Sequence, residues 1–327
     1  LRKRSARQYL DERFRRLLIP FVFGCLLLTP VMLYFEWMHK TQTGLWSMTF
    51  WEFVSSRSIP LSCQIFGWAG YHLWFLGFLF SYSLLALPLF LWLRGDRGQR
   101  AVAWMIRLCE RRGGILLAIL PLLVIQLALR PFFLEGEHNW ADFFYMLGFF
   151  ALGYILYSHE RFTQAIRRDW PLAFGVAATT SLIGIGLIAF AGAMDWLSDP
   201  AQPQFYVLVS LIVINGWSWV VLLLFVGMRF LDFSNRWLRY GQGAILPFFV
   251  FHQPVIMVIA FFVVQWDAAI LPKALVVVPS SFVVTLGIYE LLIRRSHTLQ
   301  VLFGMKPSRP GIDASASDEL QRKAHAR

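Results

Sequence analysis

The chain has 327 residues, of which 57% are hydrophobic and only 15% are charged, with a formal net charge of +11. That composition is too apolar for an ordinary soluble domain. The net positive charge would suit a nucleic-acid-binding protein, but Lys and Arg are spread over separate loops instead of one surface, and we expect no nucleic-acid partner.

Eight segments are long and apolar enough to cross a bilayer as helices of about 20 residues. Runs such as "LLAILPLLVIQLAL" are apolar on every face, which favours helices over the alternating strands of a membrane barrel. We therefore predict an all-α, polytopic integral membrane bundle over residues 1–305, followed by a disordered polar tail at 306–327. The predicted spans are 17–37, 71–93, 114–130, 140–158, 171–194, 204–228, 244–265 and 273–293.

Basic residues alternate between the connecting segments. Of the 30 Lys and Arg residues, 26 lie in segments 1–16, 94–113, 159–170, 229–243 and 294–327, and the alternate loops hold only Lys40, Arg57, Arg130 and Lys273. The positive-inside rule then places both termini in the cytoplasm, in agreement with an even number of spans. The aromatic outer loop 38–70 is expected to form a structured cap.

The first basic segment, "ERFRRLLIP", places Arg13 and Arg16 on one face of a helix at the cytoplasmic edge of the first span, with Arg15 turned away. Two guanidinium groups on one face suit the phosphates of a cytoplasmic donor. The alternative is that all three arginines only set the topology of the span.

His72 and Trp74 lie at the outer mouth of the second span, in "GWAGYHLWFLGFLF". Such rings commonly anchor a helix at the headgroup level. A functional interpretation has them line an acceptor site, where the indole stacks on the apolar face of a sugar.

His252 lies within a span, about 12 Å from the predicted cytoplasmic end at residue 244, and is followed by Gln253 and Pro254. An ionisable group at this depth is a functional hypothesis by default, although a histidine that only joins helices is equally compatible. Pro254 removes a hydrogen bond inside the helix, so its freed carbonyl needs another partner.

Other polar residues have simpler interpretations. Glu290 is a candidate pocket residue, or else an ion-pair partner of Arg294 one turn later. Asn215 is expected to join helices within the membrane. The outer group Glu135, Glu137, His138 and Asp142 matches no metal-ligand pattern, and we predict no metal site. Three cysteines, on different sides of the predicted membrane, indicate no disulfide framework.

In combination, "RFRRLLIPF", "YHLWFL" and "FVFHQPVI" resemble the membrane acyltransferase 3 family. The ending "YELLIRRSHTLQVLFGMKP" is similar to its branch that includes glucans biosynthesis protein C, which succinylates periplasmic glucans. The resemblance implies transfer of an acyl group, acetyl or succinyl, from cytoplasmic acyl-CoA to a hydroxyl of a glycan or related acceptor across a bacterial inner membrane. It assigns donor binding to Arg13 and Arg16, with acyl-CoA as co-substrate and no bound cofactor.

Family members have ten spans, with an arginine and a catalytic histidine in the first. The resemblance therefore implies that this chain is truncated, that its catalytic histidine lies upstream of Leu1, and that residues 1–327 alone are inactive. Two other classes stay open. A transporter or flippase of lipid-linked saccharides predicts inverted repeats, which we do not find, and a non-catalytic scaffold would tolerate lysine at Arg13 and Arg16.

Overall fold

The computed structural model describes residues 5–41, 48–56, 71–134 and 139–305. These ranges are helical and contain no strand. Seven helical segments are long and apolar enough to cross a bilayer, and an eighth is counted if the pair Tyr71–Leu85 and Leu87–Arg94, bent by 41°, forms one span. The predicted all-α, polytopic fold is confirmed, and the chain is an integral membrane protein.

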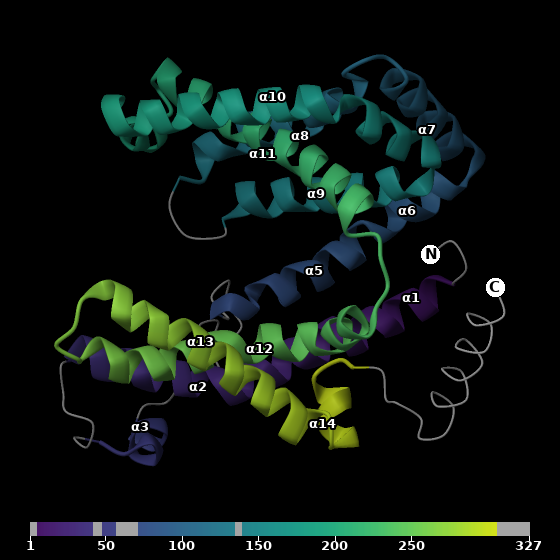
Figure 1. Cartoon of the computed structure of the whole chain (residues 1–327). Helices are drawn as coiled ribbons and strands as arrows, with labels where there is room; N and C mark the ends of the chain where they lie inside the picture. Colours follow the sequence, from purple (N-terminus) through teal and green to yellow (C-terminus); the bar gives the residue numbers. More distant parts are fainter. Residues whose placement is uncertain (1–4, 42–47, 57–70, 135–138, 306–327) are drawn as a thin grey trace. The chain divides into compact units, whose positions relative to one another are not determined.

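The chain divides into two compact units (Figure 1). The terminal unit comprises residues Leu1–Phe80 and Asn235–Arg327, and the central unit comprises Ser81–Ser234; α5 (Trp74–Leu85) crosses the boundary. The terminal unit contains α1 (Ala6–Arg13), the π-helix η1 (Phe14–Leu18), α2 (Ile19–Thr41), α3 (Phe50–Ser56), the 3-10 helix η2 (Tyr71–Leu73), α12 (Arg236–Val264), α13 (Ile270–Ile288), the π-helix η6 (Tyr289–Ile293) and α14 (His297–Leu302).

In the terminal unit, α12 packs against both α2 and α13. Its core includes Cys25, Leu73 and Val250, which are almost completely buried. The three segments approach so closely at Gly24 that an added Cβ would lie 2.9 Å from Leu73 and 3.3 Å from Val250. The short η2 helix is therefore fixed between α2 and α12, which decides where Tyr71 and His72 point.

The central unit contains α6 (Leu87–Arg94), α7 (Asp96–Cys109), the 3-10 helix η3 (Gly114–Ile119), α8 (Leu120–Leu129), η4 (Arg130–Phe132), α9 (Trp140–Ser158), α10 (Glu160–Ala191), η5 (Ala193–Ser198) and α11 (Pro203–Phe230). Its most extensive contact joins α10 and α11. There the Asn215 amide donates hydrogen bonds to the Ala177 carbonyl, Thr180 Oγ1 and Ser181 Oγ at 2.7–3.0 Å. The predicted role of Asn215 as a link between helices is confirmed.

The predicted spans agree with the helices, but several predicted loops are wrong. Segments 159–170 and 229–243 are mostly helical, because α10 begins at Glu160 and α12 at Arg236. Hydropathy detects only the apolar part of a helix and misses turns that extend into basic flanks. Loop 94–113 contains α7. The outer loop 38–70 contains α3, whose Phe53 is buried beside Tyr34, so its described part agrees with the predicted structured cap.

The remaining aromatic residues of the predicted cap, Trp46, Phe66 and Trp68, lie outside the described residues, as does the tail at 306–327. The boundary between the membrane domain and the tail stays a prediction.

Candidate functional site

The basic end of the first span starts with a well-capped helix. Ser5 and Gln8 form a capping box at α1, with the Ser5 hydroxyl accepting from the Gln8 N–H at 3.2 Å and the Gln8 side chain accepting from the Ser5 N–H at 3.1 Å. Two helical turns later the chain changes to the π-helix η1, which contains Arg15 and Arg16. A π-helix has a wider turn than an α-helix, so residues three apart in it are rotated farther from one another.

The three arginines of this segment have different environments. The Arg13 guanidinium lies over the Tyr9 ring, 5.0 Å from its centroid, and its buried Nε has no hydrogen-bond partner among the described residues. Arg16 is exposed and lies 3.6 Å from Glu12, and Arg15 pairs with Asp11 at 3.1 Å. Arg13 is thus the arginine of the three with no described ion-pair partner, while Arg16 retains donors directed to solvent.

A proline explains the position of His72. Pro254 has no N–H, so the carbonyl four residues earlier, Val250, loses its partner inside α12. His72 Nε2 contacts that carbonyl at 2.9 Å. The need for an outside partner at this position, predicted from the sequence, is met by a histidine from η2.

His72 and His252 are neighbours, with ring centroids 5.1 Å apart and ring planes 82° apart. His252 Nδ1 contacts the Phe249 carbonyl at 2.7 Å. A carbonyl only accepts hydrogen bonds, so the contacting nitrogen of each ring carries the proton. In the neutral rings, Nδ1 of His72 and Nε2 of His252 keep their lone pairs, and neither has a hydrogen-bond partner among the described residues.

His252 lies near the middle of α12. Because α12 begins at Arg236 instead of residue 244, His252 is 16 residues, about 24 Å, from the start of the helix and 12 residues, about 18 Å, from its end at Val264. An ionisable side chain in the middle of a spanning helix is a candidate for contact with a ligand or water.

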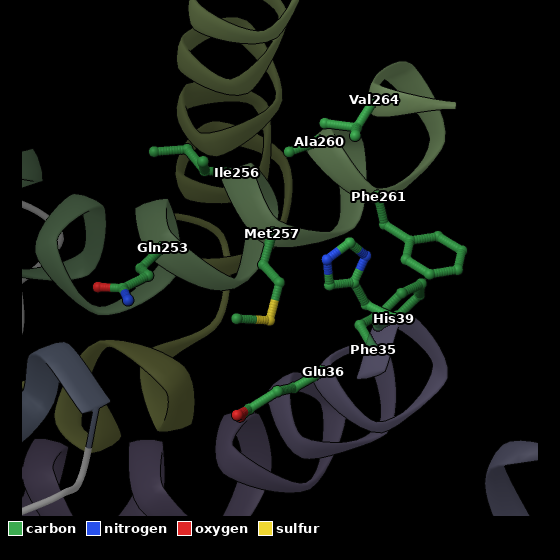
Figure 2. A pocket seen from close by; sticks show the side chains of 9 residues that line it. All are labelled: Phe35, Glu36, His39, Gln253, Ile256, Met257, Ala260, Phe261 and Val264. Atoms are coloured by element: carbon green, nitrogen blue, oxygen red, sulfur yellow. The ribbon is translucent and has the colours of Figure 1, made fainter. Parts of the chain in front are cut away.

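A cavity of about 350 Å³ lies between α2 and α12 (Figure 2). One of its lining residues, Gln253, directly follows His252 in the chain. Most of its wall is apolar, and its polar lining residues are Glu36, His39 and Gln253. Figure 2 shows His39 and Met257 pointing into the space between the two helices. The cavity is lined by Phe35, Glu36, His39, Gln253, Ile256, Met257, Ala260, Phe261 and Val264.

Tyr71 connects the cavity to the histidine pair. Its hydroxyl donates to the Glu36 carboxylate, which also accepts from Lys40. Tyr71 has φ = 44°, a left-handed conformation that costs a non-glycine residue about 1–3 kcal/mol. This strained conformation lets two consecutive side chains of η2 reach different helices. Tyr71 reaches Glu36 on α2, and His72 reaches Val250 on α12.

The predicted site residues therefore separate into groups. The structure brings together His72 and His252, and Gln253 lines the adjacent cavity. Trp74 packs edge-on against Phe78 and does not line this cavity. Glu290 lies on η6 and accepts two hydrogen bonds from Arg294 at 2.8 and 2.9 Å, as the simpler interpretation predicted.

Sequence reasoning missed Glu36, His39 and Tyr71. The available signal was the "FEWMH" ending of the first span, where a carboxylate and a histidine follow an apolar run. Asp142 of the outer acidic group pairs with Arg130 at 2.9 Å, and Glu135, Glu137 and His138 lie outside the described residues. Within the described residues, no three His, Cys, Asp or Glu side chains are grouped as metal ligands.

These features define a helical membrane protein with a basic segment at one end of its first described span and, at the other end, a mostly apolar cavity with three polar lining residues. A family model described as an acyltransferase domain matches residues 1–290. The chain belongs to this family, acyltransferase 3, and is a membrane acyltransferase. No curated protein and no solved structure matches it.

Proposed function

We propose that the protein moves an acyl group from acyl-CoA, bound at the end of the first span that carries Arg13 and Arg16, to a hydroxyl of an acceptor bound near His252. The arrangement of one helical segment is the main support. Arg16 and Glu36 are 20 residues apart on the continuous helical segment Ala6–Lys40, which corresponds to about 30 Å, the thickness of a bilayer core. Donor and acceptor groups would thus meet from opposite sides of the membrane.

The cytoplasm is the proposed donor side, because it is the source of acyl-CoA and the positive-inside rule assigns the arginine-rich segments to it. Arg13 and Arg16 offer planar donors that suit the phosphates of CoA. Arg16 would exchange its 3.6 Å contact with Glu12 for a phosphate, and Arg13 has no ion pair to break among the described residues. The membrane proposed is a bacterial inner membrane, with both ends of the chain in the cytoplasm.

At the acceptor end, His252 Nε2 is proposed to accept a hydrogen bond from the acceptor hydroxyl. A carbonyl partner for Nδ1 at 2.7 Å holds the ring in the tautomer that this contact requires. Gln253, Glu36 and His39 would bind further hydroxyls of a glycan or related acceptor. Apolar cavity walls would contact the carbon faces of the same molecule.

The proposed reaction transfers the acyl group from the sulfur of CoA to the hydroxyl oxygen of the acceptor. The acceptor oxygen attacks the thioester carbonyl, its C–O bond forms as the C–S bond breaks, the hydroxyl proton passes to a base, and CoA leaves as the thiol or thiolate. The family resemblance implies that the base is a histidine, and that assignment stays a prediction. Acetyl and succinyl are the acyl groups we expect.

Acyl-CoA binding to the full-length protein tests the donor site. Arg13→Lys with Arg16→Lys retains both charges and removes the planar donors, so we expect affinity for acetyl-CoA or succinyl-CoA to fall at least tenfold, the size of one lost charge-assisted hydrogen bond. Arg15→Lys is the matched control and should bind normally, because Arg15 is paired with Asp11. Unchanged affinity in the double variant would return Arg13 and Arg16 to a purely topological role.

A further inference from the structure

One face of the helix α7 is buried against the rest of the central unit. Gly98, Val102, Ile106 and Cys109 recur every three or four residues along it and are buried. Burial raises the pKa of the Cys109 thiol, so the side chain packs here as an uncharged group. This face contacts α6, η3 and α10, and Figure 1 shows α7 beside α6 and α10.

Both ends of α7 are held against neighbouring backbone. A Cβ on Gly98 would lie 2.2 Å from the Trp92 carbonyl oxygen, and one on Gly114, just beyond the helix, would lie 2.1 Å from the Leu108 carbonyl oxygen. The Gln99 side chain also donates to the Leu93 carbonyl at 2.6 Å. The helix is thus a fixed part of the central unit.

The membrane restricts the direction of α7. One residue, Gly95, separates α7 from α6, the second half of the bent pair that counts as one span. Four residues separate the end of α7 from the span Gly114–Phe132. Both ends of a helix about 21 Å long are therefore close to the same membrane boundary. A helix tied at both ends in this way lies along the membrane surface.

The outward face of α7 carries Arg97, Arg100, Trp104 and Arg107, which are exposed; Trp104 is 59% exposed. At 100° per residue these four side chains fall on the side opposite the buried face. Three more exposed arginines flank the helix, Arg94, Arg111 and Arg112. Among the described residues none of the six has an ion pair, and nearby Glu110 is paired with Arg161 at 2.7 Å.

We propose that this surface, defined by Arg97, Arg100, Trp104 and Arg107, binds the phosphate headgroups of anionic phospholipids. The charge is complementary to an anionic leaflet, and the positive-inside rule predicts that α7 faces the cytoplasmic one. Each guanidinium group can donate two parallel hydrogen bonds to a phosphate. The indole of Trp104, which lies among the arginines, is a side chain that favours the interface of lipid and water. The site is independent of acyl transfer.

The test measures lipid binding by the full chain in mixed micelles with short-chain phosphatidylglycerol, with phosphatidylcholine as the neutral comparison. For wild type we expect binding of phosphatidylglycerol only, weakened by added salt. Replacing Arg97, Arg100 and Arg107 together by Gln should weaken it by about fivefold for each charge removed, since a basic residue at such a surface contributes about 1 kcal/mol. The matching triple Lys variant should retain most of the affinity.

Two results would overturn the proposal. The first is equal phosphatidylglycerol affinity of wild type and the triple Gln variant, provided that both unfold at the same temperature. The second is binding of a soluble polyanion such as a short RNA to this surface in phosphatidylcholine micelles without any preference for phosphatidylglycerol, which would assign the arginines to a soluble partner.

Discussion

Two polar clusters, one in each unit, satisfy their hydrogen bonds to very different extents. In the central unit, Asp169 accepts two hydrogen bonds from Arg168 at 2.8 Å, and Arg168 also donates to the carbonyls of Cys109, Glu110 and Arg111 at 2.6–2.7 Å. In the terminal unit, His72 and His252 each make one hydrogen bond to a carbonyl and keep one nitrogen unpartnered among the described residues. A fully paired cluster stabilises a fold, whereas an open one has capacity left for a ligand.

Asp169→Ala tests the structural half of this comparison and should have the largest effect on stability. The Asp169 side chain is 1% exposed, and its loss leaves Arg168, which is 38% exposed, without its counter-charge. We expect a loss of about 3 kcal/mol in the free energy of unfolding, at the low end for a broken buried pair because Arg168 reaches solvent. Unfolding in detergent by denaturant measures it.

Glu110→Ala is the matched control, since Glu110 and Arg161 form an ion pair whose side chains are about half exposed. It should cost less than about 1 kcal/mol. Equal losses in the two variants would show that the Arg168–Asp169 cluster is no more structural than an ordinary surface pair.

His72→Leu tests whether the open cluster also has a structural part. It leaves the Val250 carbonyl without a donor in a helix already interrupted at Pro254, which should cost about 1–3 kcal/mol. His72→Gln places an amide donor near the same position and should recover part of that loss. Denaturant unfolding measures the free energy of unfolding of both variants. Identical values for His72→Leu and His72→Gln would contradict the role of the hydrogen bond.

Pro254→Ala sharpens the same point, because alanine restores the N–H that the Val250 carbonyl lacks. In the His72→Leu background it should recover about 1 kcal/mol, the net value of one hydrogen bond. A double-mutant cycle measures this coupling. Strictly additive effects would mean that His72 and Pro254 act independently at that carbonyl.

Asn215→Leu should have a much smaller effect than Asp169→Ala. Although three acceptors surround the amide, hydrogen bonds between membrane helices contribute about 0.6 kcal/mol each on average, because polar groups find other partners when the helices separate. We expect a loss of about 1 kcal/mol in unfolding free energy. A loss above about 3 kcal/mol would show that Asn215 is as important for stability as the fully paired Arg168–Asp169 cluster.

Hydropathy and charge were sufficient to predict the spans, because apolar length and loop charge act locally along the chain. The sequence also predicted that the carbonyl freed by Pro254 needs another hydrogen-bond partner, because this need depends on the proline alone. That His72 supplies this partner was not, because 178 residues separate it from Val250. The π-helix at Arg15 and Arg16 and the cavity beside Glu36 and His39 likewise depend on tertiary packing, which no local pattern encodes.

The most direct test of the acceptor site is acyl transfer by full-length protein carrying His252→Asn. The asparagine amide can still donate to the Phe249 carbonyl, so the fold should be retained, but the acceptor nitrogen Nε2 is lost. With labelled acetyl-CoA or succinyl-CoA as donor and a glucan as acceptor, we predict that kcat/KM for the acceptor falls at least tenfold while acyl-CoA affinity stays unchanged. Wild-type kcat/KM in His252→Asn would contradict the assignment of His252 to the acceptor.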